Sequence, residues 1–191
     1  MLYDSQRIKW WKERSQSLEY QTAYRNILVA MNRERCLGGT LVDVACGNGG
    51  FLKKAMPYFR EIIGADSSDE MLKLARKKLN NSKKIEFVSD DIMNLKLPPE
   101  IADITTFLFP EVAYDTEDNT GLAVRDKLRD FAEKLYGKRF EERLLTNFFR
   151  DYNLARITKT GGFMAITNYG FYVDKKTEKE RFFFMQVKQM H

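Results

Sequence analysis

Residues 40–56 read TLVDVACGNGGFLKKAM, and this stretch decides the fold. An apolar run from Thr40 to Val44 is followed by Gly47, Gly49 and Gly50, and the apolar residues after them recur at helical spacing. The stretch therefore predicts a strand, a tight turn and a helix. Glycines at such a turn let a ligand approach the backbone, and the first N–H groups of the helix point into the same space.

The turn lacks the signatures of a phosphate-binding loop. A dinucleotide-binding turn needs G-x-G-x-x-G, and Leu52 stands where the third glycine would be. The G-K-[ST] triplet of a Walker loop does not occur in the sequence. Asp43, at the end of the predicted strand, would also repel a pyrophosphate. The turn therefore favours a ligand that is not anionic.

Length and composition set the broad class. A chain of 191 residues with 43% hydrophobic and 31% charged residues is typical of one globular domain, so we expect residues 1–191 to form a single domain. The charged N-terminal segment has no signal-peptide core, and no run of 18 apolar residues occurs. We expect a cytoplasmic protein without membrane contact. Cys36 and Cys46 lack metal-ligand spacing, so we expect free thiols and no metal site.

The net charge of +5 permits an acidic partner such as nucleic acid. The basic residues are interleaved with acidic ones rather than clustered. A solvated surface is the interpretation we favour, and charge alone does not predict a nucleic-acid-binding protein.

The pattern of an apolar run ending in an acid recurs downstream. It appears at EIIGAD, ending in Asp66, and at KIEFVSDD, ending in Asp90 and Asp91. A capping box at Ser67 and Glu70 predicts a helix after the first of these, and ADITTFLFP predicts a fourth strand. Strands alternating with helices predict an α/β protein with a Rossmann-like, doubly wound, mostly parallel sheet. Ligands bind at the carboxyl ends of such strands, where the acids fall.

Three segments together resemble the class I S-adenosylmethionine-dependent methyltransferases. They are VDVACGNGG, GADSSDEMLKLAR and IEFVSDDIMNL, in the family's order and spacing, and the resemblance covers about residues 41–109. S-adenosylmethionine has no phosphate and carries a sulfonium and an ammonium group. This ligand suits Asp43.

The resemblance implies roles for individual residues. Asp43 would lie near the ammonium group, Asp66 would accept both ribose hydroxyls, and Asp91 would receive the adenine amino group. Ala45 stands where the family most often has glycine, and Asp90 stands where it usually has glycine. The full set implied for the cofactor is Asp43, Ala45, Gly47, Gly49, Asp66, Ser67, Met71, Asp91, Ile92, Phe107 and Tyr20. Simpler roles stay open, since the acids would also favour helix N-termini and Met71 would suit a core.

The sequence identifies no catalytic residue. Methyl transfer mainly needs proximity and alignment, and a general base serves only when the acceptor must lose a proton. His191, the sole histidine, is the last residue, where chain ends fray. The remaining candidates for a base are Glu111, Tyr114, Asn168 and Tyr169. FLFPEV replaces the N/D-P-P-[Y/F/W] signature, which argues against adenine N6 and glutamine acceptors.

Two further segments show helical periodicity. Residues 1–36 predict one or two helices. The resemblance implies that such a segment closes over the cofactor, with Tyr20 near the methionine carboxylate, and core packing is the alternative. Residues 119–157 predict a helical insert after strand four, interpreted as a cover over the acceptor, with Phe109, Tyr114 and Tyr169 forming an apolar acceptor pocket. A longer helix pair packed on the sheet is the alternative. GGFMAITNYGFYV and RFFFMQVKQ predict the last strands, whereas the full family sheet has seven.

The sequence therefore predicts a methyltransferase that uses S-adenosyl-L-methionine, most favourably on a small molecule. An RNA or protein acceptor is one alternative. A non-catalytic, cofactor-binding partner subunit is another. The sequence specifies neither the acceptor nor the oligomeric state.

Overall fold

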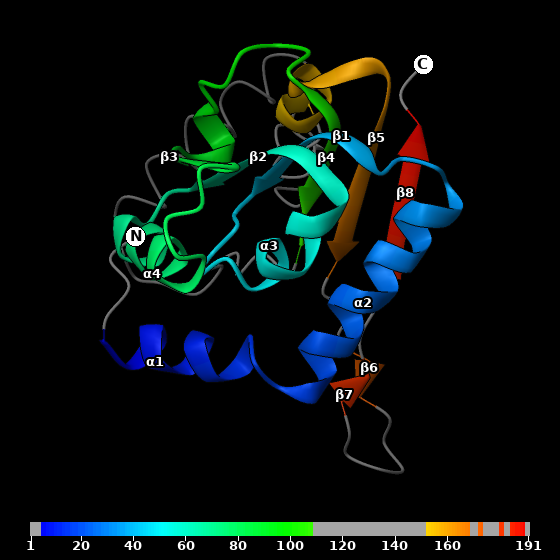
Figure 1. Cartoon of the computed structure of the whole chain (residues 1–191). Coiled ribbons are helices and arrows are strands. Elements are labelled where there is room, and N and C mark those ends of the chain that lie inside the picture. The colour runs from blue at the N-terminus through cyan, green and yellow to red at the C-terminus, as the bar shows by residue number, and fades with distance from the viewer. Residues whose placement is uncertain (1–4, 109–151, 169–171, 174–179, 182–183, 190–191) are drawn as a thin grey trace, which may run out of the picture.

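The computed structural model describes residues 5–108, 152–168, 172–173, 180–181 and 184–189 (Figure 1). The sequence predicted one or two helices in the N-terminal segment, and the described residues of this segment form two. The helices are α1 (Ser5–Arg14), α2 (Leu18–Arg33), α3 (Gly50–Ala55) and α4 (Asp69–Lys78), with 3₁₀ turns η1 (Met56–Tyr58) and η2 (Ile92–Asn94). Residues 152–157 are also helical. No helix in these ranges is long and apolar enough to cross a membrane.

The strands form one main sheet in the order β3-β2-β1-β4-β5-β8. The first five are parallel and β8 runs antiparallel to β5, so the predicted mostly parallel sheet is confirmed. A separate two-stranded sheet pairs β6 with β7. The strand bounds are β1 (Gly38–Val44), β2 (Phe59–Asp66), β3 (Ile85–Ser89), β4 (Ala102–Phe107), β5 (Thr158–Asn168), β6 (Tyr172–Val173), β7 (Glu180–Arg181) and β8 (Phe184–Gln189).

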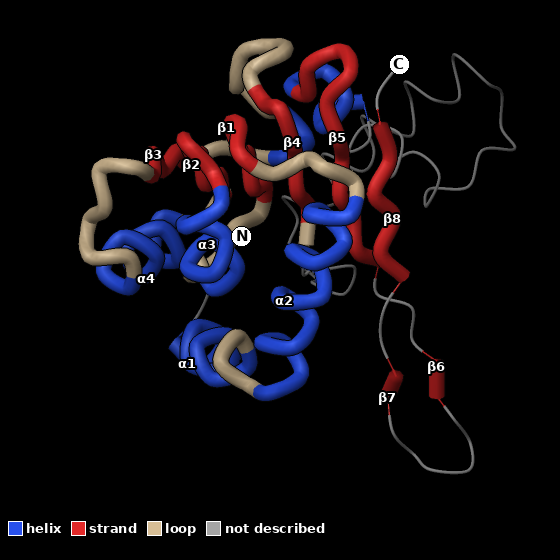
Figure 2. Tube along the Cα trace, turned by 45° about the vertical axis from the view of Figure 1, so that its right-hand side comes forward, coloured by secondary structure: helices blue, strands red, loops and turns tan. Residues whose placement is uncertain are grey.

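Alternation along the strands divides the core between the two faces of the sheet. Leu41 and Ile104 belong to the cluster that α2, α3 and α4 cover, whereas Val42 and Val44 belong to the second cluster. The second cluster also contains Leu154 from the helical residues 152–157. Figure 2 shows α2, α3 and α4 together beside one face of the sheet. Because side chains alternate, Asp43 lies on the same face as Leu41, toward these helices.

Local capping explains where two helices begin. The Ser17 hydroxyl accepts the Tyr20 N–H at the start of α2, and the Ser68 hydroxyl accepts the Met71 N–H at 3.3 Å at the start of α4. The predicted capping box at Ser67 and Glu70 is therefore wrong by one residue. Ser68 is buried and caps the helix, while Ser67 is exposed. The two serines are adjacent and chemically identical, so only the path of the chain after β2 selects between them.

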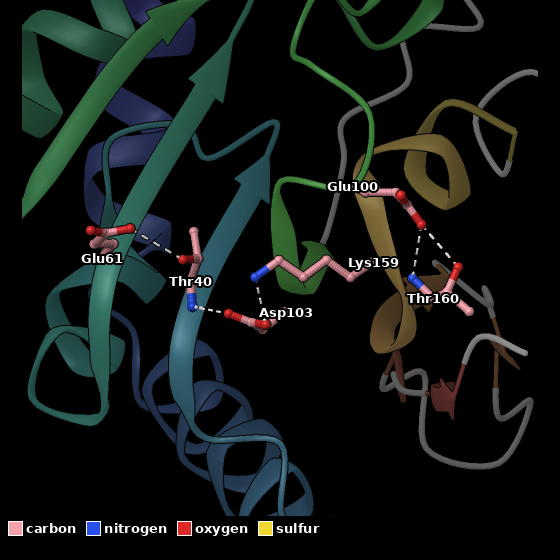
Figure 3. Close-up of polar contacts among 6 residues, drawn as sticks. All are labelled: Thr40, Glu61, Glu100, Asp103, Lys159 and Thr160. Atoms are coloured by element: carbon pink, nitrogen blue, oxygen red, sulfur yellow. Dashed lines mark hydrogen bonds and ion pairs between the residues drawn. The ribbon is translucent and has the colours of Figure 1, made fainter.

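Polar contacts join the strands at the amino edge of the sheet, opposite the predicted site (Figure 3). The Asp103 carboxylate accepts the Thr40 N–H at 2.7 Å and the Lys159 ammonium at 2.8 Å, which links β4 to β1 and β5. The Glu100 carboxylate accepts the Thr160 hydroxyl at 2.9 Å. These contacts tie β1, β4 and β5 together near their amino ends.

Several sequence expectations lie outside the described residues. They include Phe109, most of the insert 119–157 apart from its last residues, and the catalytic candidates Glu111, Tyr114 and Tyr169. Asn168 ends β5, and its side chain is also outside the described set. These expectations stay predictions.

Candidate cofactor site

Three residues of the turn between β1 and α3 have a left-handed backbone conformation. Ala45, Gly47 and Gly49 have φ values of 57°, 54° and 71°, a region that glycine adopts without steric cost. A Cβ on Gly47 would project into open space, whereas a Cβ on Gly49 would lie 3.0 Å from Leu79 and 3.2 Å from Ala75. Gly47 therefore leaves room for a ligand, and Gly49 lets α3 pack against α4.

Asp43 lies one residue before the end of β1 and is 2% exposed. Its carboxylate accepts a hydrogen bond of 2.6 Å from the Thr106 hydroxyl on β4. Burial raises the pKa of Asp43 to about 7; the Thr106 hydrogen bond opposes this rise and the charge of Asp66 adds to it. A buried carboxylate with so raised a pKa favours a cationic neighbour.

Asp66 ends the neighbouring strand β2, and its carboxylate holds the glycine turn. One oxygen accepts the Gly47 N–H at 2.8 Å and the other accepts the Ser68 N–H at 2.9 Å. Burial raises the pKa of Asp66, and these two hydrogen bonds oppose the rise. A carboxylate offers about four acceptor positions, and these two hydrogen bonds use two of them. Asp66 thus has a structural contact in addition to the predicted ribose contact.

A small cavity lies over the turn and is lined from four directions. Gly47 lines it from the turn, Met71 lines it from α4, and Leu108 lines it from the segment after β4. Trp11 and Tyr24 line it from the N-terminal helices. The complete lining is Trp11, Ser15, Tyr24, Cys46, Gly47, Asn48, Gly50, Met71 and Leu108. The predicted residues Gly47 and Met71 therefore share one cavity, which begins at the carboxyl ends of β1 and β4.

The third predicted motif divides into a buried and an exposed acid. Asp90 is 7% exposed, and its carboxylate accepts the Asp91 N–H at 3.0 Å and the Lys96 N–H at 2.8 Å. Asp91 is exposed. The Ile92 carbonyl accepts a hydrogen bond of 2.7 Å from Asn153. Asp90, the residue that departs from the family pattern, thus holds the loop, and the adenine contact of Asp91 stays a prediction.

Two other predicted cofactor residues lie deep in the protein. Tyr20 is 6% exposed, and its hydroxyl accepts a hydrogen bond of 3.2 Å from Arg14 Nε. Phe107 is 2% exposed and belongs to the core cluster on the far face from α2 and α3. Neither residue lines the cavity. Their predicted contacts with the cofactor stay predictions.

Sequence reasoning missed the residues of the N-terminal segment that line the cavity. Tyr24 stands one helical turn after Tyr20 on α2, and helical periodicity places both on the same face without distinguishing them. Burial raises the pKa of the Tyr24 hydroxyl, and the charge of Asp43 adds to the rise. Thr106 was missed as well, because nothing in the sequence shows that it pairs with Asp43 across the sheet.

These features fit S-adenosylmethionine. Gly47 has open space where a Cβ would project, so a ligand can approach its backbone. Asp43 offers negative charge to a cationic ligand, and Asp66 ends the next strand with acceptor positions to spare. Together the sheet and the site define a Rossmann-like cofactor-binding protein whose ligand lies at the carboxyl ends of the strands.

Comparisons with known proteins agree with this class. Residues 41–129 match the family described as "Methyltransferase domain". A Saccharomyces cerevisiae protein named "Probable S-adenosylmethionine-dependent methyltransferase CRG1" is 38% identical over 71 residues, covering 34% of this chain and 24% of that protein. The demethylmenaquinone methyltransferase of Staphylococcus saprophyticus is 30% identical over 94 residues, covering 48% of this chain and 40% of that protein. This chain therefore spans less than half the length of both relatives.

A solved structure shows the same fold. The N-methyltransferase NodS of Bradyrhizobium japonicum, in complex with S-adenosyl-L-homocysteine, superposes with a TM-score of 0.56 at 15% identity. The match covers 82% of this chain and 65% of that one. This likeness shows the fold, and the matches in sequence agree with the resemblance to the class I S-adenosylmethionine-dependent methyltransferases that the three motifs carry.

Proposed function

We propose that the protein transfers a methyl group from S-adenosylmethionine to a small-molecule acceptor. The observation that carries this proposal is the placement of Asp43 and Asp66 near the carboxyl ends of adjacent strands, with the Gly47 N–H of the turn donating to the Asp66 carboxylate. The cofactor supplies an activated methyl group on its sulfonium. The protein's own contribution is to bind, orient and exclude water.

Each residue has a stated part in this proposal. Asp43 faces the cationic end of the cofactor, Gly47 lets the methionine part lie against the backbone, and Asp66 accepts the ribose hydroxyls. Asp91 and the Ile92 backbone meet the adenine. Met71 lines the cavity beside the nucleoside, as its buried position on α4 supports.

The small-molecule acceptor rests on two supports. The Staphylococcus saprophyticus relative is named for demethylmenaquinone, a single organic molecule rather than a polymer. The net charge of +5 alone does not identify a surface for a phosphate-rich polymer.

The test uses S-adenosylmethionine with a radioactive methyl group and a cell extract separated into small molecules, RNA and protein. Calorimetry first establishes whether S-adenosylhomocysteine binds. We expect binding, with label entering the small-molecule fraction. Label in RNA or protein would overturn the acceptor class. Binding without label in any fraction would favour a non-catalytic cofactor-binding subunit.

A further inference from the structure

Asn48 lies between the two left-handed glycines of the turn, and its side chain points away from the strands toward the N-terminal segment. It is 5% exposed. Its amide nitrogen donates to the Ser15 hydroxyl at 3.0 Å and to the Trp11 carbonyl at 3.3 Å. Its amide oxygen accepts the Lys78 ammonium of α4 at 2.6 Å. One side chain thus joins the turn, α4 and the end of α1.

The donors and acceptors around Asn48 determine which way its side-chain amide is oriented. An ammonium only donates, so the group facing Lys78 must be the Asn48 oxygen. The amide nitrogen then faces the N-terminal segment, where two acceptors use both of its hydrogens. The Ser15 hydroxyl accepts one of these and donates onward to the Lys12 carbonyl at 3.2 Å. A chain of hydrogen bonds therefore runs from Lys78 on α4 through Asn48 in the turn to Ser15, which donates to α1.

The same N-terminal segment forms one wall of the cavity. Trp11 and Ser15 line it opposite Gly47. Contact with the turn is close, because a Cβ on Gly50 would lie 3.1 Å from the Tyr24 hydroxyl and 3.3 Å from the Ser15 Cβ. Any ligand in this cavity is therefore bounded by the segment that Asn48 holds.

We propose that Asn48 is a positioning residue that seats residues 11–15 over the cofactor cavity, with its amide oriented by Lys78. This rests on the proposed function for the identity of the ligand, whereas the seating itself belongs to the protein without ligand. A seated segment slows departure of the cofactor because it closes one wall of the cavity. If residues 11–15 lose this contact with Asn48, the main effect is a faster dissociation of the cofactor.

Asn48→Asp is the sharpest variant. The aspartate keeps the size of the side chain and the acceptor for Lys78, and it removes both hydrogens donated to Trp11 and Ser15. Ser15→Ala removes one of the two acceptors. S-adenosylhomocysteine serves as the probe because it has no net charge at neutral pH, so the added carboxylate changes its long-range attraction little.

Lys78 supplies the matched comparison. Lys78→Met removes the donor that orients the amide, and Lys78→Arg restores one. Lys77→Met, on the exposed side of the same helix, makes the same change of charge without touching Asn48. We expect the arginine and Lys77→Met variants to behave as the wild-type protein does.

The first readout is amide hydrogen exchange of residues 8–17 in the protein without ligand. Loss of a buried hydrogen bond corresponds to about a tenfold change in a local opening equilibrium. We expect exchange in this segment to rise by about that factor in Asn48→Asp, with exchange in β1 and β4 unchanged. The second readout is the dissociation rate of S-adenosylhomocysteine, expected to rise about tenfold in the same variant.

The outcomes separate the inference from the proposed function. Wild-type exchange in both Asn48→Asp and Ser15→Ala would overturn the seating. Faster exchange with an unchanged dissociation rate would overturn the link to the cofactor. If S-adenosylhomocysteine does not bind the wild-type protein, the proposed function fails, and the exchange measurement still decides whether Asn48 seats the segment.

Discussion

The Thr106 hydroxyl donates a hydrogen bond of 2.6 Å to the Asp43 carboxylate across the paired strands β1 and β4. The hydrogen bond favours the charged form of Asp43, while complete burial opposes it, and burial dominates because the pKa is raised to about 7. Asp43, buried near the carboxyl end of β1, therefore has a pKa near neutral pH.

This titration predicts how stability depends on pH. The unfolded chain has an Asp pKa of 3.8, so between about pH 4 and 7 the folded protein binds a proton that the unfolded chain releases. The contribution of Asp43 to stability is therefore largest at low pH within this window and falls as pH rises, by at most about 1.4 kcal/mol per pH unit. Asp66, whose pKa is also raised, acts in the same direction.

Asp43→Asn removes the Asp43 part of this dependence. The amide oxygen still accepts the Thr106 hydroxyl, and no charge is buried above pH 7. We expect the variant to be more stable than the wild-type protein at pH 8 and to approach it at pH 5. Urea denaturation at unit pH steps measures the free energy of unfolding. A pH slope identical to that of the wild-type protein would refute the assignment.

A second prediction concerns protons released on binding. A cationic cofactor beside Asp43 lowers its pKa, and a group with a pKa near 7 is about half protonated at pH 7. Binding of S-adenosylmethionine should then release up to about half a proton per site. Calorimetry in two buffers of different ionisation enthalpy measures this release. Asp43→Asn should bind more weakly and release none, so an undiminished release in the variant would place the proton elsewhere.

The strand ends could be predicted from sequence, and the partners of the acids could not. Apolar runs ending in an acid placed Asp43 and Asp66 at carboxyl ends of strands, because the alternation of strands and helices predicts parallel strands. That these two strands are adjacent is shown by the structure. That Thr106 would face Asp43 depends on the register of β4 against β1, which the sequence does not encode locally. Likewise, only tertiary packing decides that Tyr24 rather than Tyr20 lines the cavity.

The glycine turn gives a third prediction, with its control two residues away at Ala45. Ala45 already adopts a φ of 57°, which shows that this turn accepts a Cβ at a left-handed position. Gly47→Ala should therefore fold, at a cost of about 1 kcal/mol, while its methyl group occupies space beside the cavity. We expect binding of S-adenosylhomocysteine to weaken by at least about tenfold, since an added methyl in a close contact must displace the ligand or the turn.

The control for this variant is Ala45→Gly. It relieves the left-handed strain without adding an atom to the cavity, so binding should stay within about twofold of the wild-type value. Thermal denaturation and calorimetry of both variants provide the comparison. Equal binding by Gly47→Ala and the wild-type protein would mean that the ligand does not lie against this backbone.

The last prediction separates the two adjacent acids of the third motif. Asp90 accepts two backbone N–H groups and is buried, so Asp90→Ala leaves both donors without this partner and should cost about 1–3 kcal/mol of stability. Asp91 is exposed, and surface substitutions usually change stability by about 0.5 kcal/mol or less. Asp91→Ala should therefore leave the urea midpoint nearly unchanged and weaken S-adenosylhomocysteine binding, because the adenine amino group loses its acceptor. Adenine-free analogues sharpen the test: their affinity should be the same for Asp91→Ala and the wild-type protein. If Asp91→Ala binds S-adenosylhomocysteine normally and the stability loss falls on Asp91 instead of Asp90, the assignment of the pair is reversed.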